Sequence, residues 1–208
     1  MPQSRSPAPP DLHTQPFSVT RAQREGLHRH AGRAVWLTGL SGAGKSTTAN
    51  ALESALHAQG RRTYVLDGDY IRNGLNRDLG FGEQDRNENI RRVAEVARMF
   101  VDAGTIVIAA FISPLRAQRE AARSLFAPGD FLEVFVSTPL AVAETRDPKG
   151  LYRKARNGQL PQFTGVDAPY EPPLNAELVL PAHLWSTEQC VQALMKLLDT
   201  APGSSLPA

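Results

Sequence analysis

The amino-acid sequence predicts an α/β fold in three layers, built around a mostly parallel five-stranded sheet. Two observations support this prediction. Short apolar runs alternate along the chain with amphipathic helical patterns, which is typical of a sheet covered by helices on both faces. A glycine-rich turn, GLSGAGKS, follows the first apolar run directly and is itself followed by a helical pattern.

Five apolar runs are expected to form the strands. The longest of them, TIVIAAFI, is apolar without interruption, as expected for a parallel strand that is covered on both faces. The predicted strands are residues 34–38, 63–66, 105–112, 131–136 and 177–180.

The clearest helical pattern follows Asp85. Asp85 is expected to cap the first turn with Glu88 three residues on, and Gly104 suits the C-terminal end. A buried face at helical spacing is formed by Ile90, Val93, Ala94, Ala97, Phe100 and Val101.

A second helix is expected near the C-terminus. Ser186 and Gln189 have the spacing of a capping box, in which each side chain bonds to the backbone N–H of the other residue. The apolar face of this helix would consist of Val191, Leu194, Met195 and Leu198.

The chain is expected to hold one domain between two tails. Residues 1–17 carry five of the sixteen prolines and are predicted to be a disordered tail, and residues 201–208 a frayed one. Residues 18–33 form a basic segment that is expected to be partly helical. The folded domain is predicted at residues 34–200.

The composition is that of an ordinary globular protein. The 208 residues are 41% hydrophobic and 21% charged, with a formal net charge of only +2, which gives no argument for a nucleic-acid partner. No run approaches the ~20 apolar residues of a membrane span, and the proline-rich N-terminus lacks the apolar core of a secretory signal. The single cysteine, Cys190, is expected to be a small buried apolar residue. A cytoplasmic protein without a membrane partner is expected.

The glycine-rich turn matches the phosphate-binding pattern G-x-x-x-x-G-K-[ST] at every constrained position. Glycines let backbone N–H groups wrap closely around a phosphate, and the following helix, from Lys45 to about Gln59, points its positive end at the same group. Lys45 would bind the β- and γ-phosphates of ATP, and Ser46 would coordinate Mg²⁺. The predicted ATP-binding residues here are Gly39, Leu40, Ser41, Gly42, Ala43, Gly44, Lys45, Ser46 and Thr47.

Two aspartates follow the second strand. Asp67 and Asp69 are expected to project towards the phosphate site, because ligands of open α/β sheets bind outside the carboxyl ends of the strands. A carboxylate there either holds Mg²⁺, directly or through water, or accepts a proton from an acceptor hydroxyl. The alternative is an ordinary turn or helix cap.

A second group of candidate binding residues surrounds the start of the helix after Asp85. Arg86 suits an anionic group, and Asn89 offers an amide donor and acceptor to a base or a sugar. Phe81, between two glycines, is either a stacking surface or a core residue. Arg91 and Arg92 are interpreted as the solvated face of the helix.

Residues 146–156 carry five basic side chains against one acid, and glycines and prolines flank them. A mobile basic lid at about residues 147–170 is predicted, because such a segment closes over a triphosphate, excludes water and neutralises charge. The alternative is a solvated loop. Phe163, at the end of the lid, is a candidate for stacking on a base.

Taken together, the sequence resembles the adenylylsulfate kinase family. The resemblance is carried by GLSGAGKS, LDGD-x-IR, LGF, DRNENIRR, FISP, DPKGLY-x-KAR and FTG, and spans about residues 18–199. It implies a P-loop kinase fold, Mg²⁺, and two small-molecule substrates, ATP and adenosine 5′-phosphosulfate. The ribose 3′-hydroxyl of the latter would be phosphorylated in sulfate assimilation. A homodimer is also implied.

The resemblance further implies roles for individual residues. Lys45, Asp67 and Ser113 would be catalytic, with Asp67 as the metal-linked carboxylate and base, and Arg153 would contact ATP. The implied acceptor pocket has Phe81 and Phe163 gripping the adenine between them. Its residues are Asp69, Arg72, Phe81, Arg86, Asn89, Ile112, Ser113, Lys149, Leu151, Phe163 and Thr164.

Two positions and three rival functions stay open at this point. Tyr70 stands where the family commonly has asparagine, and Ser113 is interpreted as a pocket residue that bonds the acceptor rather than as a phosphorylated intermediate. One rival is a kinase for another small molecule, and another is a chain kept only as a partner of a sulfate-activating enzyme. A GTPase-type switch is disfavoured, because no Asn-Lys-x-Asp tetrapeptide occurs.

Overall fold

The computed structural model describes residues 15–201, and its centre is a five-stranded parallel sheet with the strand order β2-β3-β1-β4-β5. All five predicted strands are confirmed, with ends shifted by at most two residues. The bounds are β1 Arg33–Thr38, β2 Thr63–Asp67, β3 Ile106–Ala110, β4 Phe131–Val136 and β5 Leu178–Leu180.

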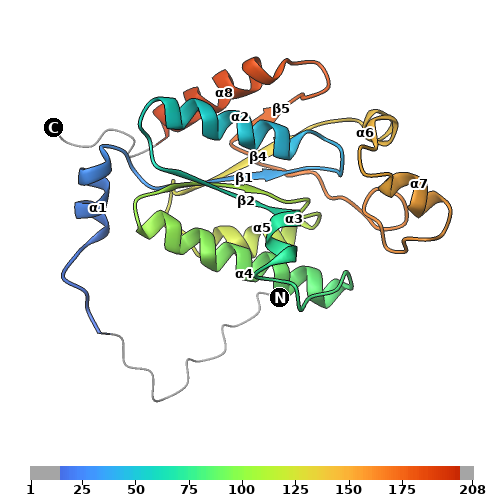
Figure 1. Ribbon diagram of the computed structural model, residues 1–208, viewed down its shortest axis with the longest axis horizontal. Helices are drawn as coiled ribbons and strands as arrows, with labels where there is room; N and C mark the ends of the chain where they lie inside the picture. Colours follow the sequence, from blue (N-terminus) through green and yellow to red (C-terminus); the bar gives the residue numbers. More distant parts are fainter. Residues whose placement is uncertain (1–14, 202–208) are drawn as a thin grey trace.

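Helices cover the sheet on both faces, as Figure 1 shows: α2 and α8 lie on one face, and α4 and α5 on the other. This arrangement confirms the three-layer prediction. The helix bounds are α1 Arg21–His28, α2 Lys45–Ala58, α3 Gly68–Asn73, α4 Glu83–Asp102, α5 Arg116–Arg123, α6 Leu140–Arg146, α7 Leu151–Arg156 and α8 Thr187–Thr200.

The central strand β1 joins the two main cores. Because side chains alternate along a strand, Val35 and Leu37 pack with α2 and α8, whereas Ala34 and Trp36 pack with α4. Every residue of β1 is buried. Full burial of a side chain such as Leu37 contributes roughly 1.5–3 kcal/mol, so β1 is held firmly and fixes the loop that follows it.

The helix α4 begins two residues before the predicted cap. Its first residue is Glu83, and Gly82 at the N-cap forms no side-chain hydrogen bond. Asp85 therefore lies inside the first turn, where its charge favours the helix N-terminus, and the predicted Asp85 cap is wrong. The predicted buried face is confirmed, except that Phe100 is only half-buried.

The C-terminal helix α8 opens as predicted. Ser186 accepts a hydrogen bond from the N–H of Gln189, and the Gln189 side chain accepts one from the N–H of Ser186. Leu194 and Leu198 are buried, and Val191 and Met195 are half-buried against the same core. This reciprocal cap fixes the start of α8.

The basic N-terminal segment is partly helical, as predicted. Thr20 and Gln23 form a capping box at the start of α1, and Arg21 pairs with Asp130, the residue before β4. This contact places α1 at the amino ends of the strands, at the opposite end of the molecule from α6 and α7 (Figure 1).

The described chain ends at residues 15 and 201, so the predicted tails lie almost entirely outside it. Within residues 15–201, no helix has the length and apolar character that a membrane crossing requires.

Candidate active site

The phosphate-binding loop connects β1 to α2 and needs its glycines. Gly39 and Gly44 have φ angles of 154° and 105°, which side chains with a Cβ rarely adopt. A Cβ on Gly39 would also lie 2.6 Å from the Val136 carbonyl oxygen. The loop is thus a backbone cradle whose shape excludes larger residues.

Lys45 lies at the bottom of this cradle. Its ammonium group is buried and donates hydrogen bonds to the carbonyls of Gly39, at 2.9 Å, and Leu40, at 2.7 Å. Burial lowers its pKa to about 8, and the positive charge of Lys149 acts in the same direction. A bound anion would oppose both effects and raise the pKa again, so this amine is suited to phosphate.

The second strand brings a carboxylate to the loop. The Ser46 hydroxyl donates to Oδ2 of Asp67 at 2.6 Å, and Asp67 also caps α3 by accepting from the N–H of Asp69 at 3.0 Å. Mg²⁺ prefers hard oxygen ligands and often binds through one or two carboxylates plus substrate phosphates. A hydroxyl and a carboxylate that converge at the phosphate loop fit this ion.

These groups open into one large cavity of about 1180 Å³, which exceeds the usual range of about 300–1,000 Å³ for a single ligand. The cavity extends from the phosphate loop to the start of α4 and the lid. Its lining includes most residues assigned from the sequence: Ser41, Gly42, Gly44, Lys45, Ser46, Thr47, Asp67, Asp69, Arg72, Phe81, Arg86, Asn89, Ile112, Ser113, Lys149, Leu151, Phe163 and Thr164.

Four assigned residues are not part of this lining. Gly39 and Ala43 form the back of the loop, where Ala43 is fully buried. Leu40 turns to a second hollow, described below. The guanidinium of Arg153 lies next to Gly150, because a Cβ built on that glycine would be 3.2 Å from Nη2 of Arg153. Arg153 does not line the cavity.

An aromatic ring and two arginines mark the far side of the cavity. The guanidinium of Arg72 lies 4.4 Å from the centre of the Phe81 ring, and Arg86 donates to the carbonyls of Phe81 and Gln162 at 2.8 and 2.5 Å. Desolvation lowers the pKa of both arginines. Phe81 is 61% exposed, so it is not a core residue.

The other aromatic of the predicted pair is in a different environment. Phe163 lines the cavity but is 93% buried, given its 7% exposure, and its ring meets that of Tyr152 edge-on at 5.0 Å. The hydroxyl of Tyr152 donates to the carbonyl of Ser41 at 3.0 Å. Phe163 is therefore held against the phosphate loop through the lid.

Asn89 is oriented by a residue that the sequence did not suggest. The amide nitrogen of Asn76 donates to the amide oxygen of Asn89 at 3.0 Å, and both side chains are buried. Asn76 lies in the loop after α3, whose isolated sequence gives no sign of this contact. The bond fixes which end of the Asn89 amide remains available to a ligand.

Ser113 lies just after β3 in a strained backbone conformation, with a φ of 37°. Its hydroxyl accepts a hydrogen bond from the indole N–H of Trp36 at 3.1 Å. The hydroxyl proton is not used in this bond, and Ser113 lines the cavity.

The segment predicted to be a lid contains the short basic helix α7. Asp147 accepts from the backbone N–H groups of Tyr152 and Arg153, each at 3.1 Å, and so caps α7. Lys149 forms an ion pair with Asp69 across the cavity mouth. The basic segment thus contacts the carboxyl end of the sheet through an exposed ion pair.

The cavity also has a wall that the sequence analysis missed. It is formed by the loop after β5 and the start of α8, with Arg146 donating to the carbonyl of Ala182 at 3.2 Å. The position of these residues directly after the last strand could have predicted this wall, because ligands of open α/β sheets bind at the carboxyl ends of the strands. The lining residues here are Ala182, Trp185, Ser186, Thr187, Glu188 and Cys190. Cys190 is buried, as predicted, and burial raises the pKa of its thiol.

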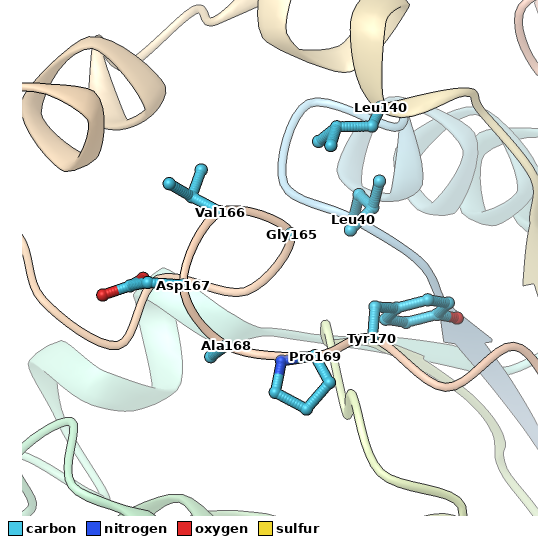
Figure 2. Close-up of a pocket in the computed structure, with 8 residues that line it drawn as sticks. All are labelled: Leu40, Leu140, Gly165, Val166, Asp167, Ala168, Pro169 and Tyr170. Atoms are coloured by element: carbon cyan, nitrogen blue, oxygen red, sulfur yellow. The ribbon is translucent and has the colours of Figure 1, made fainter.

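A second hollow of about 500 Å³ lies between the phosphate loop and the end of the lid (Figure 2). Leu40 and Leu140 face Gly165, where a Cβ would meet their side chains at 3.1 and 3.2 Å. The hydroxyl of Tyr170 hydrogen-bonds that of Thr38 at 3.0 Å. This hollow lies where residues 165–170 run from the end of the lid segment back towards the sheet.

A phosphate-binding loop after the central strand β1, a carboxylate at the end of β2 and a basic segment beside them define a P-loop kinase. Its family can be stated as well. The family model for adenylylsulphate kinase matches residues 31–181, and the chain belongs to this family.

Individual relatives agree with this assignment. The adenylyl-sulfate kinase of Geotalea daltonii is 59% identical, over 80% of this chain and 82% of its own length. That of Yersinia pestis is 53% identical, over 92% of this chain and 88% of its own. Among solved structures, the Mycobacterium tuberculosis APS kinase CysC in complex with AMPPNP and APS is 46% identical, with a TM-score of 0.78, over 82% of this chain and 99% of its own.

Proposed function

We propose that the protein transfers the γ-phosphoryl group of ATP to the ribose 3′-hydroxyl of adenosine 5′-phosphosulfate. The products are 3′-phosphoadenylyl sulfate and ADP, and the reaction serves sulfate assimilation. The observation that carries this proposal is the single cavity that joins a phosphate loop to a separate set of cationic, amide and aromatic groups. One anionic nucleotide would occupy each end, with Asp67 between them.

On the donor side, Lys45 and the loop N–H groups hold the β- and γ-phosphates. Lys45 exchanges its bonds with the carbonyls of Gly39 and Leu40 for bonds to phosphate oxygens. Ser46 and Asp67 would hold Mg²⁺, which neutralises charge on the β- and γ-oxygens when it is bound. Arg146, Ala182 and Trp185 form the wall that would contact the rest of ATP.

On the acceptor side, the charged and aromatic groups match adenosine 5′-phosphosulfate. Arg72, Arg86 and Lys149 offer positive charge to its phosphosulfate, and Phe81 and Phe163 offer faces to its adenine. Asn89 would bond to the base or the sugar. The remaining proposed contacts are Asp69, Ile112, Ser113, Leu151 and Thr164.

The chemical step needs positioning and charge neutralisation more than covalent catalysis. The 3′-oxygen forms a bond to the γ-phosphorus as the bond from that phosphorus to the β–γ bridging oxygen breaks. Asp67 receives the proton of the 3′-hydroxyl late in this step. Lys149 and Arg146, which both line the cavity, screen the negative charge that spreads over the transferred group.

The decisive experiment measures ADP formation with and without adenosine 5′-phosphosulfate. ADP formation that depends on this compound, together with isolation of the 3′-phosphorylated product, would support the proposal. A panel of sugars and other nucleotides separates it from a kinase for another acceptor. Binding without turnover would favour a partner role instead, and the absence of both binding and turnover would overturn the proposal.

The proposed homodimer needs its own measurement. Light scattering on the purified chain, at concentrations spanning those used for activity, gives its mass relative to the 22.6 kDa of one chain. A monomer at all active concentrations would contradict the dimer and leave the proposed reaction unaffected.

A further inference from the structure

Arg119 is a buried charged residue for which the proposed reaction has no use. It lies on α5 and is 2% exposed. Its Nε donates to Oε1 of Glu133 on β4 at 2.6 Å. Its Nη1 donates to the carbonyl of Ser113 at 2.6 Å, and its Nη2 to the carbonyl of Glu171 at 2.7 Å. One planar guanidinium therefore joins three segments that are distant in the sequence.

The first segment is the turn that presents Ser113 to the cavity. A non-glycine residue with positive φ is strained by roughly 1–3 kcal/mol and persists only where surrounding contacts enforce it. Trp36 holds the hydroxyl of Ser113, whereas Arg119 holds its carbonyl. Together these two contacts constrain the direction of the hydroxyl.

The second segment is the end of the lid. The N–H of Glu171 donates to the carbonyl of Pro114 at 2.8 Å, and the carboxylate of Glu171 accepts from the N–H of Arg116 at 2.7 Å. The residue before Glu171, Tyr170, lies with its ring centre 5.9 Å from the Arg119 guanidinium. The lid is thus docked on the residues that follow Ser113.

We propose that Arg119 is a positioning residue for the acceptor nucleotide. It acts through Ser113 and through the anchor of the lid, and it sets the distance between the pocket floor and the lid residues Phe163 and Thr164. Glu133 fixes the guanidinium so that its two terminal nitrogens, Nη1 and Nη2, face the two carbonyls. This inference rests on the proposed acceptor, adenosine 5′-phosphosulfate.

The same helix supplies a matched control. Arg123 follows Arg119 by one helical turn and donates to the other oxygen of Glu133 at 3.3 Å and to both oxygens of Glu177 at 2.7 and 2.8 Å. Its hydrogen bonds go to the sheet side and not to Ser113 or Glu171. A substitution there disturbs the same ion-pair network without touching the pocket.

The test compares Arg119→Lys with Arg123→Lys by steady-state kinetics and thermal unfolding. Lysine keeps the charge beside Glu133 but lacks the fork that reaches three acceptors. We expect Arg119→Lys to raise the KM for adenosine 5′-phosphosulfate about tenfold or more, the scale of hydrogen bonds from a charged donor. The KM for ATP should stay within about twofold, and Arg123→Lys should change neither KM by more than that.

Intrinsic fluorescence gives a second readout. The chain has two tryptophans, so a Trp185→Phe background leaves Trp36, whose indole bonds to Ser113. Arg119→Lys in this background should shift the emission of Trp36, and Arg123→Lys should not.

Three results would overturn the inference: an unchanged acceptor KM in folded Arg119→Lys, equal rises in both KM values, or the same effects from Arg123→Lys. If Arg119→Lys does not fold, the double variant Arg119→Met/Glu133→Gln removes the buried charge with its partner and is tested in the same way. Failure of both to fold would make Arg119 a structural residue and would also overturn it. Loss of acceptor dependence in the unmodified protein would instead refute the proposed function.

Discussion

The hydroxyl of Ser46 lies 2.6 Å from a carboxylate oxygen of Asp67, a residue 21 positions further along the chain. The two belong to different strand–helix connections, and only the parallel pairing of the sheet brings them together. This contact lies between the two ends of the cavity.

Asp67→Asn should lower kcat by about a hundredfold or more while the chain stays folded. The amide can still cap α3, but it neither accepts the acceptor proton nor offers a charged oxygen to Mg²⁺. The measurement is kcat as a function of Mg²⁺ concentration. Ser46→Ala should need more Mg²⁺ than the unmodified protein, and a kcat within twofold for Asp67→Asn would contradict the assignment.

Lys45→Met should lose about 3 kcal/mol or more of transition-state stabilisation, which is the scale for a key charge-stabilising donor. Methionine fills the buried volume without a charge, so folding should persist. Thermal unfolding in the absence of nucleotide serves as the control for structure. Near-normal kcat/KM in this variant would refute the role of Lys45.

The pKa of Lys45 predicts a pH dependence. Because burial lowers that pKa to about 8, the free protein loses the Lys45 charge as pH rises through about 8. The KM for ATP should therefore increase above this pH, and Lys45→Met should not show the increase.

The same pKa has the opposite consequence for stability. Between about 8 and the ordinary 10.5 the unfolded chain binds this proton and the folded chain does not, so the contribution of Lys45 to the free energy of unfolding grows as pH rises. Urea titrations of Lys45→Met and the unmodified chain across this range measure the difference. A contribution that falls with pH would contradict the lowered pKa.

Ser113→Ala should keep substantial turnover, with kcat reduced by no more than about tenfold, because direct transfer to the hydroxyl needs no covalent intermediate. The indole N–H of Trp36 loses its partner in this variant, which should cost about 1–3 kcal/mol of stability. Single-turnover kinetics and thermal unfolding check the two effects. Complete loss of turnover with intact folding and acceptor binding would count against this role.

Lys149→Ala should change activity but not stability. The ion pair with Asp69 is exposed, and such pairs contribute about 0–1 kcal/mol, so the unfolding temperature should stay almost constant. The kcat/KM for the acceptor should fall, since Lys149 lines the cavity. Lys154→Ala, on α7 and outside the cavity lining, provides the control and should leave kcat/KM unchanged.

Tyr70→Asn should leave the acceptor KM within about twofold. Tyr70 is 70% exposed and does not contribute to the cavity lining, so the departure from the family pattern falls outside the pocket. Competition between adenosine 5′-phosphosulfate and other adenine nucleotides measures selectivity. A large change in either quantity would show that Tyr70 contacts the acceptor during turnover.

The fold and most of the cavity were predictable because their signals are local. The phosphate loop, the strand that ends at Asp67 and the start of α4 each carry their functional residues within a few positions of an element boundary. The predicted start of α4 lay too far along the chain, because the N-cap residue is Gly82, which has no side chain that a capping pattern could reveal.

The remainder depends on contacts between distant segments. The roles of Asn76 and Arg119 follow from their buried partners, Asn89 and Ser113, which no spacing pattern connects. Arg153 was assigned to ATP from the resemblance, and whether it reaches the nucleotide depends on where the lid helix lies. The wall at Trp185 arises only when α8 packs beside α2.

A ribosome-bound chain emerges with β1 before either of the strands that flank it. The hydrogen-bonded neighbours of β1 end at Ala110 and Val136, so β1 has no partner strand until the nascent polypeptide has passed Ala110, and it lacks its second partner until Val136. The apolar β1 is exposed to chaperones and to aggregation during that interval. When α8 then leaves the ribosome, it completes the cavity wall at Trp185 and, beside α2, the helical layer on that face of the sheet.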